Sequence, residues 1–411
     1  MTERSSTLQR VVLPEPLLRA ALGRFLREPA QVLLHPAGLN VTEDCCEWLV
    51  RGQANVGDAP VGPAVLLTAQ PAIQPLLSSA PVALVHLPRR GRPRVRMADG
   101  DGALDRGVLR IMAPGLAETQ AGALTHSQAL PVSERFSRVA GALGDPLWQR
   151  LLALRFALVG CGRTGSLLAT TLIRMGVRDL ALIDPDTVEA STLDGAGYFL
   201  PQLGSPKAET LGNYLRVVSP GVTVTPCANS VTSLAALAAV KRADLLVCAA
   251  DNDGARWACG LLSARYLKVL LDVGVGVFSP LSSPATDGPS MGAEVRLIVP
   301  GSEAGPCLAC FGGVANPQQV AALFRSAGDE RRSQEERVWR QERAGSLRFL
   351  AEMAGGHGLA LLFGFLSGRV AGSTWLRVEF DADGLPAVHR VSPQRRADCP
   401  LCATLGQGDA A

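Results

Sequence analysis

The sequence has few aromatic residues, little net charge and no long apolar run, and each shortage excludes a class of protein. Only 5% of its 411 residues are aromatic, and the formal net charge is +3 at pH 7. So small a charge provides no general attraction for nucleic acid. No uninterrupted apolar run reaches the roughly 18 residues of a membrane span, and the polar residues 1–9 lack the apolar segment of a signal peptide. We therefore expect a cytoplasmic protein with no nucleic-acid and no membrane partner.

What the sequence does contain is a large apolar fraction in alternating helical and extended segments. Apolar residues make up 47% of the chain and charged residues 19%, which suffices for a large core and for more than one domain. We expect an N-terminal accessory α/β domain over residues 1–130 and a second domain over residues 131–411. The accessory domain should contain a helix at 14–26 and strands at 31–34 and 81–86. In the second domain we expect helices at 145–153, 205–218, 233–241, 254–266 and 347–366, strands at 156–159, 180–183, 222–225, 245–248, 269–273, 294–299, 375–380 and 387–391, a loop at 274–292, and a mobile or helical crossover at 314–345.

The stretch 156–186 organises the second domain. A hydrophobic strand runs into Gly160-x-Gly162-x-x-Gly165, a helix follows, and the next apolar strand ends at Asp184. The glycines permit a tight turn, a close approach of backbone to phosphate and close helix–strand packing, and the helix N-terminus presents N–H groups to an anion. Asp184 lies 24 residues after Gly160, where an acid accepts hydrogen bonds from ribose hydroxyls. The stretch predicts a nucleotide site in a Rossmann-like, doubly wound, mostly parallel sheet.

A second acid is expected at the same edge of this sheet. Asp251 follows the strand expected at 245–248. In an open parallel sheet, ligands bind beyond the carboxyl ends of the strands, so Asp251 and Asp184 should face one crevice.

Four of the ten cysteines form two C-x-x-C pairs near the end of the chain. They are Cys307, Cys310, Cys399 and Cys402, with 88 residues between the pairs. Paired knuckles of this kind place four thiolates around zinc at distances of about 2.3 Å, in sites that are usually closed and structural. We therefore expect a zinc ion that ties the C-terminal part of the chain to its middle. A redox role is the alternative, and neither pair has a thioredoxin-like context.

Taken together, these residues resemble the ThiF/MoeB/HesA family, related to ubiquitin-activating enzymes. The resemblance covers about residues 131–405. It implies ATP-dependent adenylation of the C-terminal glycine of a ubiquitin-like protein by a homodimer. The residues that carry it are an arginine-bearing segment at 134–138, the glycine turn, D-x-D at Asp184 and Asp186, Pro206-Lys207, Asp251-Asn252 and both cysteine pairs.

The resemblance also implies a role for each site residue. Asp184 would hold the ribose, Lys207 would reach the phosphates, and Asp251 would hold Mg²⁺, an ion that prefers carboxylate oxygens. Arg138 would reach across a dimer interface into the partner's site. The rest of the nucleotide-binding set is Gly160, Gly162, Arg163, Gly165, Asp186 and Asn252. The alternatives are an exposed lysine in a first helical turn for Lys207, a surface ion pair for Arg138 and a helix N-cap for Asp251.

The chain departs from the family pattern after D-x-D. Where the family usually reads S-N-L-x-R, this chain reads Ser-Thr-Leu-Asp-Gly at residues 191–195. Thr192 replaces the asparagine, and Gly195 replaces an arginine that faces the phosphates, which removes a bidentate phosphate clamp. Either Arg163 or Arg174 substitutes for it, or adenylation is slow or needs a partner to complete the site.

A second departure concerns the residue that receives the activated carboxyl group. Many relatives use a cysteine in the crossover, but none occurs here between Phe311 and Asp398, which excludes a thioester at that place. We expect Cys161, Cys248 and Cys259 to be buried apolar residues, and Cys45 and Cys46 remain candidates. Serines in or near the crossover would form an oxyester if a base such as His357 activated them; they are Ser326, Ser333 and Ser346.

The accessory region leaves the biological setting open. The sequence His86-Leu87-Pro88 after an expected strand resembles part of the zinc motif of JAB/JAMM isopeptidases, but the second histidine is absent. A metal-free relic and an unrelated α/β domain both fit, and the basic residues 89–96 are expected to form a solvated loop. The extra domain and the variant motif favour a bacterial ubiquitin-like conjugation pathway, including antiviral defence, with a conjugating-enzyme homologue as partner. Sulfur-carrier activation in cofactor synthesis is one alternative, and a catalytically degenerate leader-peptide or partner-docking module is another.

Overall fold

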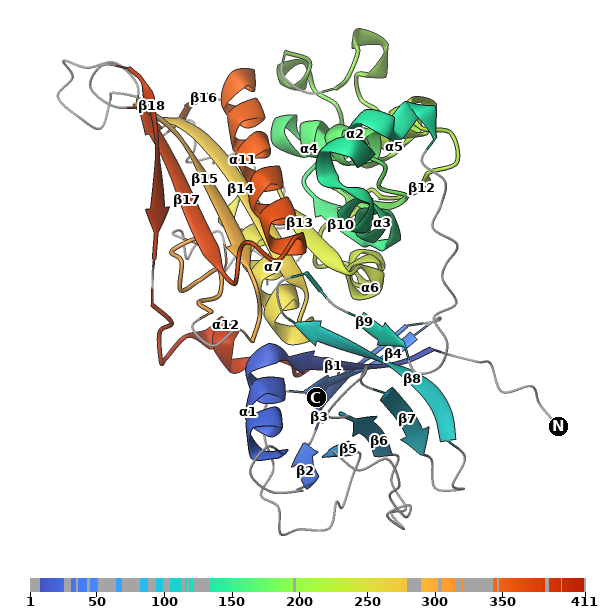
Figure 1. Cartoon of the computed structure of the whole chain (residues 1–411). Helices are drawn as coiled ribbons and strands as arrows, with labels where there is room; N and C mark the ends of the chain where they lie inside the picture. Colours follow the sequence, from blue (N-terminus) through green and yellow to red (C-terminus); the bar gives the residue numbers. More distant parts are fainter. Residues whose placement is uncertain are drawn as a thin grey trace.

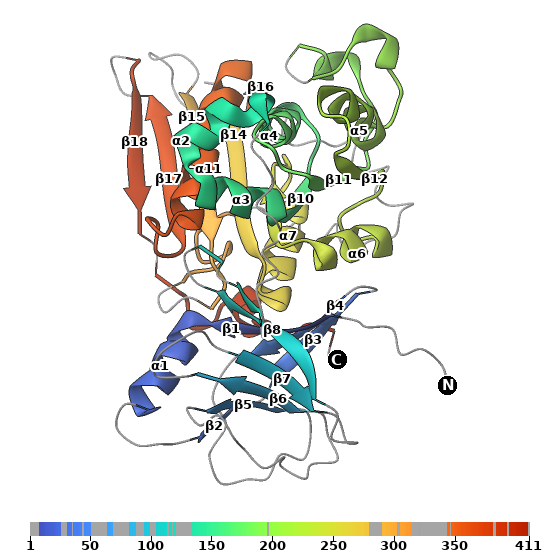
Figure 2. The same cartoon turned by 45° about the vertical axis from the view of Figure 1, so that its right-hand side comes forward.

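In a computed structural model the chain forms two nine-stranded sheets, one from residues 8–120 and one from residues 155–391 (Figures 1 and 2). The predictions on the three serines fall outside the described residues, as does most of the crossover 314–345. The structure describes residues 8–25, 31–34, 36–42, 45–50, 64–68, 82–87, 94–98, 104–112, 115–116, 118–120, 133–194, 197–278, 290–301, 305–314, 320, 343–345, 347–380, 384–392 and 394–409.

The N-terminal sheet has the strand order β2-β5-β6-β7-β8-β1-β4-β3, with β9 also paired to β8. Its central strand β1 runs parallel to both neighbours, β4 and β8. The buried side chains of β1, Val11 and Leu13, pack with Trp48, Val65 and Val85 from other strands. The elements are β1 Leu8–Pro14, α1 Glu15–Phe25, β2 Gln31–Leu34, β3 Pro36–Val41, β4 Cys45–Val50, β5 Ala64–Thr68, β6 Val82–His86, β7 Arg94–Ala98, β8 Leu104–Met112 and β9 Glu118–Gln120.

This sheet confirms the expected helix and both expected strands of the region, but it corrects one prediction. Of the basic stretch expected to be a loop, Arg94 to Arg96 lie in β7, which pairs with β6 and β8. Val95 between the arginines is fully buried while Arg96 is exposed. The alternation of basic and apolar residues is therefore the period of two of a strand with one face in water.

The second sheet has the order β12-β11-β10-β13-β14-β15-β17-β18, with β16 also paired to β14. The first five strands are parallel, in the order of a dinucleotide-binding sheet, and the last three are antiparallel. The fold class predicted from the sequence is confirmed. The strands are β10 Arg155–Val159, β11 Asp179–Ile183, β12 Thr223–Cys227, β13 Leu245–Cys248, β14 Val269–Phe278, β15 Ser290–Ile298, β16 Arg343–Gly345, β17 Thr374–Phe380 and β18 Pro386–Val391.

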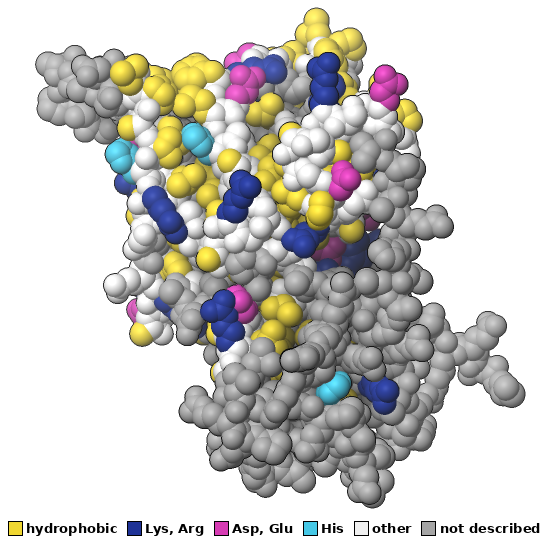
Figure 3. Space-filling view, in the orientation of Figure 1, with side chains coloured by type: hydrophobic (Ala, Val, Ile, Leu, Met, Phe, Trp, Pro, Cys, Tyr) yellow, Lys and Arg dark blue, Asp and Glu magenta, His cyan; other side chains and the backbone are white. Residues whose placement is uncertain are grey.

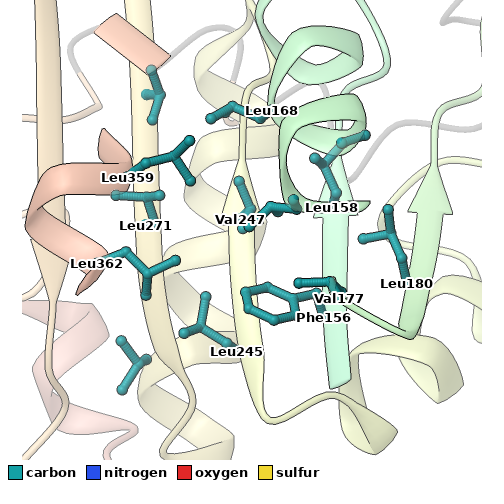
Figure 4. Close-up of a cluster of buried hydrophobic side chains, with 14 of the residues drawn as sticks. Phe156, Leu158, Leu168, Val177, Leu180, Leu245, Val247, Leu271, Leu359 and Leu362 are labelled. Carbon is teal, nitrogen blue, oxygen red and sulfur yellow. The ribbon is translucent and has the colours of Figure 1, made fainter. Parts of the chain in front are cut away.

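Helices cover both faces of this sheet, because successive side chains of its buried strands point to opposite sides. Phe156 and Leu158 of β10 pack toward one face, where Figure 4 shows them beside Leu168, Leu180 and the helix that carries Leu359. Ala157 and Val159 pack toward the other face. The first face carries α4 Arg163–Arg174, α5 Lys207–Val218 and α11 Arg348–Leu366, and the second carries α6 Leu234–Arg242 and α7 Asp253–Tyr266.

Helix α11 is apolar because it is a core helix. Among the described helices it alone is long and apolar enough to cross a membrane, by length and composition only, and 50% of that window is buried. It packs on α4, β14 and β15. Glycines allow this close approach, since a Cβ on Gly358 would lie 3.1 Å from Val273 Cγ2. Its hydrophobic face is therefore used within the protein.

The loop expected at 274–292 is in part wrong. Strand β14 continues to Phe278 and β15 begins at Ser290, and the two pair along their whole extensions, from Gly274 with Glu294 to Phe278 with Ser290. The many small residues in this stretch had favoured the prediction of a loop. At position 274, however, a glycine is needed because a Cβ there would lie 2.4 Å from Arg256 Nη2.

The two sheets meet through buried ion pairs at the end of the second sheet where its parallel strands begin. Asp244 precedes β13 and pairs with Arg110 of β8 at 2.7 Å, and Lys268 precedes β14 and pairs with Glu47 of β4 at 2.9 Å. Arg10 of β1 also pairs with Glu47, at 2.6 Å. The carboxyl ends of the strands, where a nucleotide is expected, point away from this junction (Figure 2).

Candidate functional site

The glycine turn between β10 and α4 is shaped by backbone contacts that exclude larger residues. Gly160 has φ +91°, and a Cβ on it would lie 2.8 Å from Ala249 C. A Cβ on Gly165 would lie 1.7 Å from Gly160 O. Gly162, which precedes the first residue of α4, has no atom within 4 Å of where its Cβ would be. Gly160 and Gly165 are thus required by packing, whereas Gly162 borders open space at the helix N-terminus.

Asp184 lies at the end of β11, beside this turn. It is 5% exposed, and its carboxylate accepts hydrogen bonds from Cys161 N at 2.5 Å and Asp186 N at 2.8 Å. Burial raises the pKa of Asp184, and the neighbouring Asp186 adds to this, while Lys207 opposes it. The backbone bonds fix the carboxylate at the edge of the sheet, which suits a group that accepts from ribose hydroxyls.

Lys207, the first residue of α5, lies against both acids of the D-x-D motif. Its Nζ is 3.0 Å from Asp186 Oδ2, and its side chain is 12% exposed, so it is not an exposed lysine of a first helical turn. Burial disfavours its charge, but Asp184 and Asp186 outweigh burial, and Asp251 adds to them, so that the Lys207 pKa is raised. The lysine is therefore a fixed cation near three acids, two from the loop after β11 and one from the loop after β13.

Asp251 and Asn252 follow β13, at the same edge. Asn252, and not Asp251, caps α7: its side chain accepts from Ala255 N at 2.7 Å. The Asp251 carboxylate is exposed and acts on Lys207 electrostatically. An exposed carboxylate at this edge fits the oxygen ligands that Mg²⁺ takes, usually one or two carboxylates with water and phosphate.

Arg163 and Arg174 lie at opposite ends of α4. Arg163 forms an ion pair with Asp194 and donates to Ser191 O at 3.1 Å. Arg174 is exposed in the last turn of the same helix, about 16 Å away at 1.5 Å per residue. Only Arg163 of these two therefore lies at the glycine turn.

Arg138 is an exposed residue of α2 Ser137–Leu143. The neighbouring helix α3 Asp145–Ala153 is anchored by Trp148, whose Nε1 donates to Met175 O at 3.2 Å at the C-terminal end of α4. Phe136 packs on Trp148 with ring centroids 6.0 Å apart. The segment that carries Arg138 is thus fixed beside the end of α4 that is remote from the glycine turn.

Sequence reasoning missed two residues that hold the site together. Arg256 of α7 is 7% exposed, donates from Nε to Ala250 O at 3.2 Å and binds Asp272 of β14 at 2.8 Å. It fixes the backbone just before Asp251. Tyr198 OH donates to Cys161 O at 2.7 Å and lies 3.3 Å from Lys207 O, which joins the glycine turn to α5. The sequence did contain one signal for Arg256, because it is a charged residue on the inner side of a helix that is otherwise apolar there.

The four expected zinc ligands come together. Their sulfur atoms all lie within 4.8 Å of one another, with Cys307–Cys399 at 3.3 Å and Cys310–Cys402 at 3.7 Å. Four sulfurs at about 2.3 Å from a tetrahedral zinc would lie about 3.8 Å apart, so the donor set fits zinc. Cys307 and Cys310 are also 3.7 Å apart, so all four sulfurs form one cluster, as a single metal site requires, which disfavours the redox alternative. Cys399 leads into the short helix α12 Pro400–Ala403.

Several of the remaining cysteines are buried and are poor nucleophiles. Cys161 and Cys248 are fully buried, as expected. A hydrogen bond with Cys248, together with burial, raises the pKa of Cys259, and burial raises that of Cys161. Burial also raises the pKa of Cys45 to about 11. A thiolate is the reactive form, so these positions do not favour a thioester.

Comparisons with known proteins agree with this geometry. The sequence model of the ThiF family matches residues 136–382. Ubiquitin-like modifier-activating enzyme 5 of Gallus gallus is 28% identical over 52% of this chain and 53% of its own. The SAMP-activating enzyme E1 of Haloferax volcanii is 32% identical over 30% of this chain and 47% of its own. The adenylyltransferase and sulfurtransferase MOCS3 of Bos taurus is 33% identical over 43% of this chain and 36% of its own.

The chain spans about half the length, or less, of the curated relatives it matches. Among solved structures, E. coli MccB with ATP aligns at 18% identity and a TM-score of 0.49, over 66% of this chain and 74% of that chain.

Proposed function

Because this chain belongs to the ThiF family, we propose that it is an adenylyltransferase that uses ATP to activate the C-terminal glycine of a ubiquitin-like protein. The observation that carries the proposal is the meeting of Asp184, Lys207 and Asp251 around the glycine turn. These are a ribose acceptor, a phosphate-binding cation and a carboxylate for a divalent ion. The names of relatives such as ubiquitin-like modifier-activating enzyme 5 support the substrate class.

The reaction needs positioning and charge neutralisation more than it needs proton transfer. A C-terminal carboxylate is ionised at neutral pH, so its oxygen attacks the α-phosphorus of ATP without a base. The new bond joins that oxygen to phosphorus, the bond from the α-phosphorus to the bridging oxygen breaks, and pyrophosphate leaves. Lys207 remains charged through the reaction because its pKa is raised, and it neutralises developing charge on the phosphates. Mg²⁺ held by Asp251 would supply further charge neutralisation.

The zinc proposed at the four cysteines has a structural role. It would bind Cys307 and Cys310 after β15 to Cys399 and Cys402 near the end of the chain. Beyond this site, Asp409 N donates to Leu39 O at 2.6 Å and Asp409 Oδ2 accepts from Lys241 at 2.9 Å. The ion therefore holds the segment that reaches from the second domain to the edge strand β3.

We propose a homodimer as the active form, in which Arg138 enters the partner's site. Its exposure on α2, remote from its own glycine turn, supports this role. A protein partner is also supported by large apolar side chains that stay exposed at the start of α11 and along β18. Figure 3 shows hydrophobic side chains gathered on the upper left of this face of the molecule, where Figure 1 places β18. They are Leu347, Phe349, Leu385 and Val388, between 41% and 62% exposed.

The proposed setting is a cytoplasmic bacterial ubiquitin-like pathway, including antiviral defence, with a conjugating-enzyme homologue downstream. The absence of cysteine between Phe311 and Asp398 supports transfer of the adenylate directly to that partner. The name of the relative MOCS3 supports the second candidate, activation of a sulfur-carrier protein. A thiocarboxylate product formed with a sulfur donor would distinguish the second from the first.

Exchange of labelled pyrophosphate into ATP tests the adenylation directly. We expect exchange only with the cognate ubiquitin-like protein, and a loss of roughly 100-fold or more in Asp251→Ala, because charge stabilisation of this kind typically contributes that much. Asp398→Ala is the control, since its side chain is 84% exposed near the cysteine cluster. No exchange with any ubiquitin-like protein from neighbouring genes would favour the docking module instead, and full exchange in Asp251→Ala would reject the magnesium site.

A further inference from the structure

Two cation–carboxylate pairs lie near the glycine turn. Lys207 binds Asp186, and Arg163, which directly follows Gly162 of the turn, binds Asp194. The Arg163 side chain is 21% exposed, whereas that of Asp194 is 66% exposed. The arginine is thus held in place at the site, while its carboxylate partner lies largely in water.

Hydrogen bonds fix the described parts of the loop that pairs with Arg163, residues 189–192 within the loop and residues 197–198 against α4 and the glycine turn. Glu189 N donates to Thr192 Oγ1 at 3.0 Å, and Thr192 is buried. Farther along the same loop, Gly197 N donates to Ser166 Oγ at 3.3 Å, and Tyr198 OH donates to Cys161 O. The Arg163 guanidinium therefore joins the start of α4, directly after Gly162, to this loop.

The ion pair with Asp194 contributes little free energy to the position of the Arg163 side chain. Ion pairs with largely exposed partners contribute roughly 0–1 kcal/mol. A guanidinium makes two parallel, charge-assisted hydrogen bonds to a phosphate, which is a stronger contact. A polyphosphate bound at the turn would therefore replace the Asp194 carboxylate at Arg163 with a gain in free energy.

We propose that Arg163 binds the polyphosphate of the nucleotide and that Asp194 occupies its guanidinium until the nucleotide arrives. The inference rests on the proposed adenylation, and it assigns phosphate recognition to a residue inside the glycine turn itself. Asp184 serves the ribose, Lys207 serves the phosphate that is attacked, and Arg163 serves the far phosphates. The site then distinguishes a nucleoside triphosphate from a monophosphate mainly through Arg163.

Calorimetric titration of the full-length protein with Mg–ATP and with AMP tests this assignment. We expect Arg163→Ala to weaken ATP binding by about 10- to 100-fold, the range for a lost hydrogen-bonded contact to a charged group, and AMP binding by less than about threefold. Arg163→Lys should recover part of the loss, since it keeps the charge but not the fork. Asp194→Asn should bind ATP more tightly than the wild type, because it removes the competing carboxylate.

Arg174→Ala is the matched control, since it removes an arginine from the other end of the same helix. It should leave both affinities unchanged, and melting temperatures within a few degrees of the wild type would show that all variants fold. The inference would be overturned if Arg163→Ala bound ATP as tightly as the wild type does. It would also be overturned if Asp194→Asn and Arg163→Ala lost ATP affinity equally. Neither result would affect the proposed function, which pyrophosphate exchange by the wild type tests separately. A wild-type protein that binds no ATP would overturn both.

Discussion

At the scale of single residues, the glycines of the turn between β10 and α4 have different roles. A Cβ on Gly165 would lie 1.7 Å from the carbonyl oxygen of Gly160. A Cβ on Gly162 would have no atom within 4 Å, and the φ of Gly162 is an ordinary −69°. We expect Gly165→Ala to lower the free energy of unfolding by about 3 kcal/mol or more, because backbone has to move. Gly162→Ala should change it by less than about 0.5 kcal/mol.

The substitution at Gly162 should act on the affinity for ATP rather than on stability. Gly162→Ala adds a methyl group where phosphate approaches the helix start, so ATP affinity should fall by about tenfold or more, equivalent to about 1.4 kcal/mol. Urea denaturation and ATP titration of both variants are the measurements. A stable Gly165→Ala protein, or unchanged ATP affinity in Gly162→Ala, would show that the turn does not hold the nucleotide as inferred.

At the scale of elements, the four-cysteine cluster joins the loop after β15 to α12 and to the C-terminal segment, and it is the proposed zinc site. We expect about one zinc per purified chain and a loss of most of it in Cys402→Ser, because one of four thiolate ligands is removed. Chelation should also lower the melting temperature, since metal binding contributes to folding. Cys46→Ser, in β4 and outside the cluster, is the control and should keep its zinc. Metal analysis that finds no zinc in the wild type would reject the site.

Elements governed by local patterns were predictable from the sequence, and those governed by distant contacts were not. Helix α3 at Asp145–Ala153 and strand β13 at Leu245–Cys248 lie within the residues expected for them. The extension of β14 beyond Val273 was missed, because Gly274 makes room for Arg256 rather than for a turn. Most of the N-terminal sheet was missed for a similar reason, since strands such as β1 and β8 pair across about 100 residues of chain.

The same distinction applies to the site. Asp184 and Asp251 follow strands, so the edge of a parallel sheet brings them together as expected. Arg256 depends on Asp272, 16 residues later, and on the space left by Gly274. Sequence spacing alone does not reveal such a contact. The roles assigned to Arg138, Lys207 and Asp251 stay predictions until variants are measured.

At the scale of the whole molecule, the junction of the two sheets depends on a buried cluster of six ionic side chains. Glu47 and Asp244 carry the negative charge, and the partners from both sheets are Arg10, Arg110, Arg155 and Lys268. We expect Glu47→Gln to lower the free energy of unfolding by about 3–5 kcal/mol, because it leaves buried cations without their carboxylate. Glu352→Gln is the matched control. Its pair with Arg348 on α11 is exposed, so little change is expected.

The cluster should also make the molecule sensitive to acid. Burial opposes the Glu47 charge, but Lys268, Arg110 and Arg10 outweigh it and lower the Glu47 pKa from 4.5 to about 2. Arg110 and Arg155 likewise lower the pKa of Asp244 against the effect of burial. Because both folded-state pKa values lie below the unfolded values, the stability they contribute is complete above the unfolded pKa and is lost as pH falls toward the folded one.

For Glu47 that window runs from about pH 4.5 down to about pH 2, and the linked loss is on the order of 3 kcal/mol. Urea denaturation at steps through this window should show a steeper loss of stability in the wild type than in Glu47→Gln, which has no carboxylate at that position to protonate. Equal slopes in the two proteins would mean that Glu47 is not ionised within the cluster and that the other ion pairs of the junction, such as Arg110 with Asp244, carry its acid sensitivity.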